Sequence, residues 1–165
     1  MMYKSADKRF GVQIDAECVD DMVAHIKTAG NKETGGILIG FYNEQRDAAI
    51  VKKITGPPSD SRSDRTWFNR GVKGLQQLLN KVWKERQYYL GEWHYHPNAS
   101  PDPSFCDKAQ MINIATSAQY HCPEPILIII GGSALNNTMK VFVTIEGKRL
   151  MELEKQISSI DFGSK

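Results

Sequence analysis

The residues best suited to chemistry lie in one segment, GEWHYHPNASPDPSFCD, which runs from Gly91 to Asp107. His94 and His96 fall in a stretch with the character of a strand, and a period of two places both imidazoles on the same face. If a helix begins at Ser104, Asp107 lies in its first turn and can fold back over the end of that strand. Two imidazoles and one carboxylate make a three-ligand set, which suits zinc with water in the fourth position.

Each of these residues also has a purely structural explanation. A His-x-His pair on a strand is often two half-exposed residues, and Ser104-x-x-Asp107 is also a helix-capping pattern. Glu92 shares a strand face with the two histidines, so it is a candidate general base or a partner that orients a ligand histidine. Cys106 offers a thiolate, although a free cysteine on a helix more often turns into the core. The segment alone therefore leaves both interpretations open.

The wider pattern resembles the JAMM (JAB/MPN) metallopeptidases. His94-x-His96 is followed after seven residues by Ser104 and two residues later by Asp107, and Glu33 opens the upstream glycine-rich run ETGGILIG. The resemblance implies that the two histidines and Asp107 hold Zn²⁺, that Glu33 is the general base for the attacking water, and that Ser104 stabilises the oxyanion. Spacing alone does not bring Glu33 to the metal, so its role rests on the resemblance.

The resemblance extends over about residues 8–150 and implies cleavage of isopeptide or peptide bonds after ubiquitin-like tails. The short loop Pro97–Pro103 is similar to that of prokaryotic JAB proteins, and among these to the JAB isopeptidases of CBASS anti-phage operons. The expected partner is a protein substrate with an extended C-terminal tail, either a cGAS-like nucleotidyltransferase or a ubiquitin-like protein. The alternatives are a maturation protease or deconjugase of another ubiquitin-like operon, a non-catalytic MPN-like scaffold, and a metal-dependent hydrolase of a small molecule.

Composition limits the class of protein. The chain has 165 residues, 41% of them hydrophobic, which fits one globular domain. We expect that domain to span residues 8–155, followed by a short tail, 156–165. The net charge is only +2, and acidic and basic residues are interspersed along the chain. This pattern indicates neither a nucleic-acid nor a membrane partner. An odd number of irregularly spaced cysteines and the absence of an apolar N-terminal segment indicate a cytoplasmic protein without a disulfide framework. The oligomeric state is left open.

Hydrophobic periodicity predicts the elements that must position the site. Alternating or buried apolar runs predict strands at Lys8–Ile14, Thr34–Tyr42, Ala48–Thr55, Tyr88–Tyr95, Pro125–Gly131, Met139–Ile145 and Arg149–Glu154, the last with a short helix as the competing prediction. Helical spacing predicts helices from about residue 15 to 30, at Val72–Arg86 and from Ser104 to about Gln119. We expect an α/β fold: a mixed sheet sandwiched by helices, which the resemblance identifies as the cytidine-deaminase-like JAB/MPN fold.

The segment Gly56–Arg65 (GPPSDSRSDR) is predicted to be a flexible loop, because proline, serine and aspartate dominate it. Our hypothesis is that it borders a groove in which the extended tail of the substrate binds by strand addition. The nearby aromatic residues Trp67 and Phe68, together with Trp83 and Trp93, are expected in the core rather than against a ligand.

Overall fold

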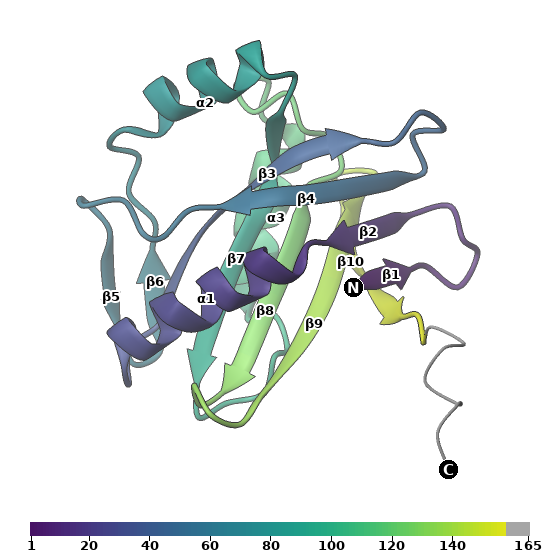
Figure 1. Ribbon diagram of the computed structural model, residues 1–165. Coiled ribbons are helices and arrows are strands. Elements are labelled where there is room, and N and C mark those ends of the chain that lie inside the picture. Colours follow the sequence, from purple (N-terminus) through teal and green to yellow (C-terminus); the bar gives the residue numbers. More distant parts are fainter. Residues whose placement is uncertain (158–165) are drawn as a thin grey trace.

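The computed structural model describes residues 1–157, so most of the predicted tail 156–165 lies outside the described residues (Figure 1). In chain order the elements are β1 (Met2–Lys4), β2 (Gly11–Ile14), α1 (Ala16–Ala29), β3 (Thr34–Tyr42), β4 (Ala48–Ile54), β5 (Arg62–Asp64), β6 (Trp67–Asn69), α2 (Leu75–Lys84), β7 (Tyr88–Pro97), α3 (Phe105–Thr116), β8 (Ile126–Gly132), β9 (Asn137–Ile145) and β10 (Arg149–Lys155). Within residues 1–157, none of the helices is long and apolar enough to span a bilayer.

The main sheet is a closed barrel of eight strands in the order β1-β10-β9-β8-β7-β3-β4-β2, in which β1 also pairs with β2. The pairs β2–β4 and β7–β8 are parallel, and the other pairs of the barrel are antiparallel. The predicted α/β fold, a mixed sheet sandwiched by helices in the cytidine-deaminase-like manner, is therefore wrong for this chain, whose sheet closes into a barrel. Strands β5 and β6 form a separate two-stranded hairpin.

Two local features help the eight-stranded sheet to close into a barrel. Strand β1 is only three residues long, and its Tyr3 pairs with Val12 on one side and with Lys155 on the other. Strand β3 shifts register against β7 between Leu38 and Ile39, and against β4 one residue later. Such bulges bend a strand and increase its twist, which brings the two edges of the sheet together.

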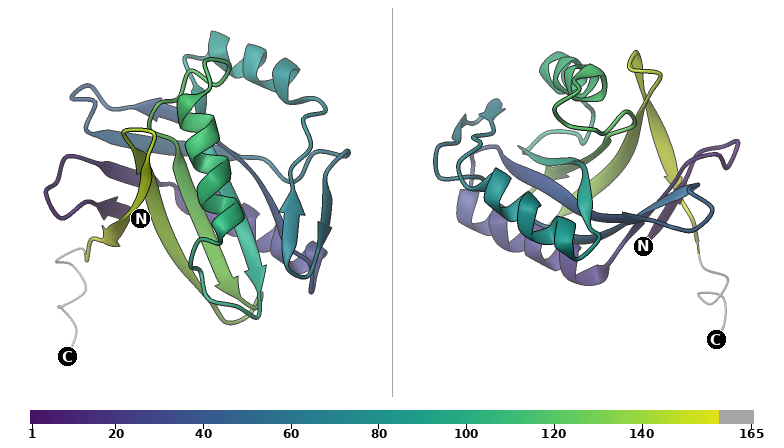
Figure 2. Two further views of the ribbon diagram at one scale, coloured as in Figure 1. Left: turned by 180° about the vertical axis from the view of Figure 1, so that it is seen from behind. Right: turned by 90° about the horizontal axis from the view of Figure 1, so that it is seen from above.

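The hydrophobic core has two parts, one on each face of the barrel wall. All eight barrel strands and α1 contribute to one cluster, which fills the inside. The second cluster lies between the outer face and the helices α2 and α3. Because side chains alternate along a strand, β7 directs Trp93 inward and Glu92, His94 and His96 outward. The outward residues face α3, which lies behind the sheet in Figure 1 and in front of it in the left view of Figure 2.

The structure corrects several local predictions. Residues 62–64 of the predicted loop are strand β5, so the segment is partly ordered as a hairpin. Trp83 and Trp67 were expected in the core, but their side chains are 67% and 49% exposed. Cys106 is exposed rather than buried. Residues 149–155 form a strand, so the competing short helix is wrong. Trp93 is fully buried, as expected.

Candidate metal centre

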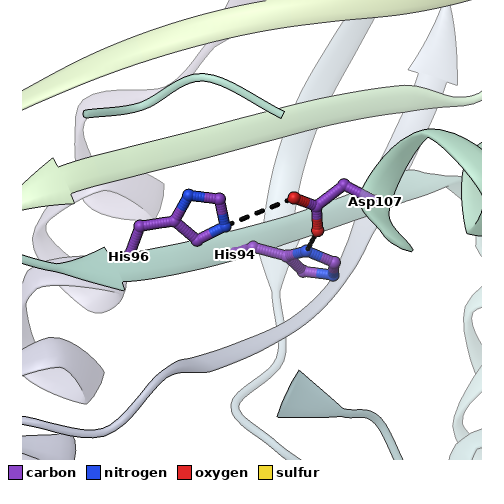
Figure 3. Close-up of side chains that lie close together, drawn as sticks. All are labelled: His94, His96 and Asp107. Atoms are coloured by element: carbon purple, nitrogen blue, oxygen red, sulfur yellow. Dashed lines mark hydrogen bonds and ion pairs between the residues drawn. The ribbon is translucent and has the colours of Figure 1, made fainter. Parts of the chain in front are cut away.

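Three side chains with metal-ligating atoms converge between β7 and α3. His94 and His96 project outward from β7, and Asp107 reaches them from the first turn of α3 (Figure 3). Nδ1 of His94 lies 2.7 Å from Oδ1 of Asp107, and Nε2 of His96 lies 3.4 Å from Oδ2 of the same carboxylate. One ligand atom from each residue lies within 4.8 Å of the others, and all three residues are buried. The structure thus brings together the three residues that the sequence predicted as ligands.

A capping box fixes the carboxylate of this cluster. The backbone N–H of Asp107 donates to Oγ of Ser104 at 3.1 Å, and the backbone N–H of Ser104 donates to Oδ2 of Asp107 at 2.7 Å. The Ser104 hydroxyl also donates to Oδ2 at 2.7 Å. The capping prediction for Ser104 is therefore confirmed. Asp107 is held by its own helix start, with Oδ1 turned toward His94.

The donor set fits a small divalent cation. A tetrahedral ion with bonds of about 2.0–2.1 Å separates its ligand atoms by roughly 3.3–3.4 Å. The 3.4 Å between Nε2 of His96 and Oδ2 of Asp107 matches this value, whereas Nδ1 of His94 lies 2.7 Å from the other oxygen, Oδ1, so this contact must lengthen when a cation binds. Nε2 of His94 is turned toward Glu92 instead: it lies 3.5 Å from Oε2 and makes no hydrogen bond with any described residue. Two imidazoles and one carboxylate are the donor set typical of catalytic zinc sites, in which water takes the fourth position, rather than of closed structural sites.

The ionisable groups of the cluster hold one another in their charged forms. Burial alone would lower the pKa of His94, but Asp107 and Glu92 raise it to about 9. The pKa of His96 is also raised, because Asp107 and Glu33 outweigh the opposing effect of burial. Burial tends to raise the pKa of Asp107, but the hydrogen bonds to His94 and His96 bring it well below its usual range. A bound cation would displace one of the two N–H protons of each imidazolium, since ligand histidines are neutral.

Behind His94 lies Glu92, whose side chain is fully buried. Arg70 and Tyr89 donate to Oε1, and the amide of Gln110 donates to Oε2 at 2.8 Å. Oε2 also lies 3.5 Å from Nε2 of His94. The sequence singled out Glu92 but missed Arg70 and Gln110. No local signal could have found them, because they lie 22 and 18 residues away along the chain.

Glu33 lies at the start of β3, beside this cluster. The β3–β7 register pairs Gly35 with His94 and Thr34 with Tyr95, so Glu33 lies at the level of His96 and on the same face. Its backbone N–H donates to the carbonyl oxygen of Asp64 in β5 at 2.8 Å. Burial raises the pKa of the Glu33 carboxyl, and the nearby His96 acts in the opposite direction. The Glu33 side chain also borders an open hollow of about 240 Å³.

Replacing Ser104 by alanine is expected to lower the free energy of unfolding by about 1 kcal/mol, because an N-cap serine typically contributes that amount. The substitution removes the acceptor for the Asp107 N–H and one donor to its carboxylate. Urea denaturation of the metal-free protein measures the effect. Ser104→Thr retains the hydroxyl and is the control. An alanine variant as stable as the wild type would show that the cap contributes nothing.

Comparisons with known proteins agree with this geometry. A family model described as prokaryotic homologs of the JAB domain matches residues 15–145. A CD-NTase/cGAS isopeptidase of Enterobacter hormaechei is 44% identical over 130 residues, which cover 79% of this chain and 72% of that protein. A probable metalloprotease of Sinorhizobium fredii is 28% identical over 132 residues, which cover 76% of this chain and 78% of its relative.

The fold is also shared with a solved structure. The solution structure of a protein from Desulfitobacterium hafniense matches with a TM-score of 0.64 at 19% identity, covering 90% of this chain and 96% of that chain. The match to the family model covers most of the chain and includes the whole segment that carries the metal-ligating residues. The protein is therefore a member of the prokaryotic JAB-domain family.

Proposed function

We propose that this protein is a zinc-dependent isopeptidase that removes the C-terminus of a cGAS-like nucleotidyltransferase from its conjugation target. The observation that carries the proposal is the convergence of His94, His96 and Asp107 on the outer face of the barrel, with Glu33 beside them. The substrate class is supported by the name of the relative that is 44% identical, a CD-NTase/cGAS isopeptidase. We place this activity in the bacterial cytoplasm, in anti-phage defence of the CBASS type.

The roles of the side chains follow from their positions. His94, His96 and Asp107 would hold the metal, and zinc, when bound, polarises the scissile carbonyl and lowers the pKa of its water from 15.7 toward about 7. Glu33 takes a proton from the attacking water as the new C–O bond forms, and passes it to the leaving lysine amine as the C–N bond breaks. The Ser104 hydroxyl turns from Oδ2 of Asp107 to donate to the oxyanion.

Glu92, the other candidate base, is less suited to that role. Its side chain is fully buried, and both of its oxygens accept hydrogen bonds from neighbouring side chains. A general base must reach the water that it deprotonates. Glu33 is only partly buried and lies at the level of His96 on the same face, so it meets this requirement better.

The β5–β6 hairpin is the part of the structure best placed to hold the tail of the substrate. Among the described strands, β5 pairs only with β6, which leaves a strand edge beside the site. Phe68 of β6 packs edge-on against the ring of His94, with 5.7 Å between ring centroids, and Asp64 of β5 accepts the hydrogen bond from Glu33. We therefore propose that this segment borders the substrate groove and that an extended tail adds along the hairpin.

Replacing the half-exposed Trp67 of this hairpin by alanine is expected to raise KM several-fold with little change in kcat, because its ring is available to the tail but does not touch the metal cluster. Steady-state cleavage of a tail fusion measures both constants. Trp83→Ala is the matched control, since Trp83 is an exposed tryptophan on α2, against Tyr88 at the other end of β7. An unchanged KM for Trp67→Ala would contradict a docking role for the hairpin.

The proposed function is tested by cleavage of a fusion that carries the C-terminal tail of a CD-NTase joined to a lysine side chain. Wild-type protein is expected to cut after the last residue of the tail, and to lose this activity when zinc is chelated and regain it on readdition. A linear fusion of the same tail tests the alternative of a maturation protease. A ubiquitin-like tail tests a deconjugase of another operon. Metal content is measured in each sample, and a zinc-loaded protein that cuts none of these tails would contradict the substrate assignment.

Two observations speak against the remaining alternatives. A scaffold would have no need to keep two histidines and an aspartate converging in buried positions, yet this chain keeps all three. A small-molecule hydrolase would be expected to enclose its substrate in a pocket over the metal. Neither the hollow of about 240 Å³ beside Glu33 nor the hollow of about 900 Å³ beside Trp83 and Tyr120 is lined by any of the three ligand residues.

A further inference from the structure

The buried carboxylate of Glu92 is held by three side chains, Arg70, Tyr89 and Gln110. Nε and Nη2 of Arg70 lie 2.9 Å and 2.7 Å from Oε1, and the hydroxyl of Tyr89 donates to the same oxygen at 3.1 Å. Gln110, on α3, donates to Oε2. A buried carboxylate needs such partners, because an unpaired charge in the interior is costly. The arrangement also fixes the direction in which Oε2 points, and that direction is toward His94.

The ring of His94 is held at each of its edges. Nδ1 contacts Asp107 on the side where the ligand atoms converge, and Nε2 lies 3.5 Å from Oε2 of Glu92. The carbon edge lies against Gly35, since a Cβ at that position would be 3.0 Å from Cδ2 of His94. Turning the ring over would place Cδ2 against Asp107 and a nitrogen against Gly35. The surroundings therefore favour the orientation with Nδ1 toward the cluster.

We infer that Arg70 is a positioning residue for the metal centre: it holds Glu92 so that the carboxylate orients His94 with Nδ1 as the ligand atom and Nε2–H as the donor to Oε2. The inference rests on the proposed function, because it presupposes that the cluster binds a metal. A ligand histidine usually donates its second ring N–H to a carboxylate or carbonyl group, and that partner sets both the tautomer and the direction of the ring. Glu92 is the group at that position here, and Arg70 is its charged partner.

Arg70 also links the metal centre to the hairpin. It follows β6 directly, and Nη1 donates to the carbonyl oxygen of Gly71 at 2.8 Å while Nη2 contacts the hydroxyl of Tyr120 at 3.2 Å. Its side chain is 5% exposed, so the guanidinium is enclosed together with the carboxylate that it binds. The residue that directly follows the hairpin, Arg70, therefore binds the carboxylate of Glu92, which lies beside His94.

The test compares zinc affinity and folding stability in three variants, with affinity measured by competition against a chromogenic chelator. Arg70→Met leaves the Glu92 carboxylate charged and without its guanidinium partner. The free energy of unfolding is therefore expected to fall, and the zinc affinity is expected to fall by about 10- to 100-fold. The double variant Arg70→Met/Glu92→Met removes both charges and is expected to recover most of the stability while remaining about 10- to 100-fold weaker for zinc. Tyr120→Phe removes only a contact of Arg70 with a hydroxyl and is expected to bind zinc like the wild type.

The outcomes separate positioning from a purely structural role. A double variant that recovers stability and zinc affinity together would overturn the inference. If the wild-type protein binds no zinc, the proposed function is wrong and the inference falls with it. If the wild type binds zinc tightly but the variants bind it equally well, only the role inferred for Arg70 and Glu92 is wrong. Long-range ¹H–¹⁵N spectra of the zinc-loaded wild type give an independent reading. They are expected to show His94 bound through Nδ1 with a proton on Nε2, and binding through Nε2 would overturn the orientation.

Discussion

Glu33→Gln is expected to lower kcat for cleavage of the tail fusion by about 10²–10⁴-fold, which is the usual contribution of a positioned general base. Glutamine has nearly the same shape as glutamate but cannot accept a proton from the attacking water. The three ligand side chains and their contacts with one another do not involve Glu33, so the variant is expected to keep its zinc. Single-turnover cleavage rates, with metal content measured on the same samples, check both expectations.

Glu85→Gln is a suitable control for this substitution, because Glu85 forms a surface ion pair with Lys53 and has no contact with the cluster. It is expected to cleave at the wild-type rate. If Glu33→Gln binds zinc and still cleaves at the wild-type rate, another group is the base and the mechanism proposed for Glu33 is wrong. If the variant loses zinc as well as activity, Glu33 acts through the metal site and not as a base.

Gly35→Ala is expected to damage both the barrel and the metal centre. A Cβ at this position would lie 2.3 Å from the carbonyl oxygen of Trp93, 2.9 Å from Cε1 of Phe68 and 3.0 Å from Cδ2 of His94. Strands β3 and β7 would have to separate, which is expected to lower the free energy of unfolding by about 1–3 kcal/mol. Because the carbon edge of His94 would be displaced, zinc affinity is expected to fall by about 10-fold or more. Calorimetry and chelator competition measure the two effects.

Gly40→Ala separates the two effects, because Gly40 lies on the same strand away from the cluster. A Cβ at Gly40 would lie 1.8 Å from the carbonyl oxygen of Ile50 in β4. The control variant is expected to lose stability to a similar extent while its folded fraction keeps wild-type zinc affinity. Equal loss of affinity in both variants would mean that the effect of Gly35→Ala comes from general loosening of the sheet and not from contact with His94.

The parts of the structure that could be predicted are those that depend on neighbouring residues. The alternation in β7 places His94 and His96 on the face opposite Trp93, and the structure has this arrangement. The start of α3 could be predicted because Ser104 and Asp107 satisfy each other across one helical turn. Family membership was confirmed by comparison, whereas the roles of the site residues stay predictions until the variants are measured.

The parts that could not be predicted depend on pairs that are distant in sequence. Closure of the barrel needs β1, a three-residue strand with no pattern of its own, to meet β10. The ion pair of Arg70 with Glu92 joins a hairpin end to a central strand, and no local spacing encodes it. Helical periodicity assigned Trp83 to the buried face of α2, but the helix packs mainly through Val82 and the half-buried leucines, so Trp83 is left at the surface.

The seam between β1 and β10 has a consequence for how the chain is made. Tyr3 pairs with Lys155, so the barrel joins segments from opposite ends of the described chain. During synthesis on the ribosome, His94, His96 and Asp107 emerge well before β10, and until then β1 and β9 each present an unpaired edge. Contacts of such long sequence separation form late and slowly. We therefore expect the nascent protein to be exposed to edge-to-edge association at these two edges until residues 149–155 have been released.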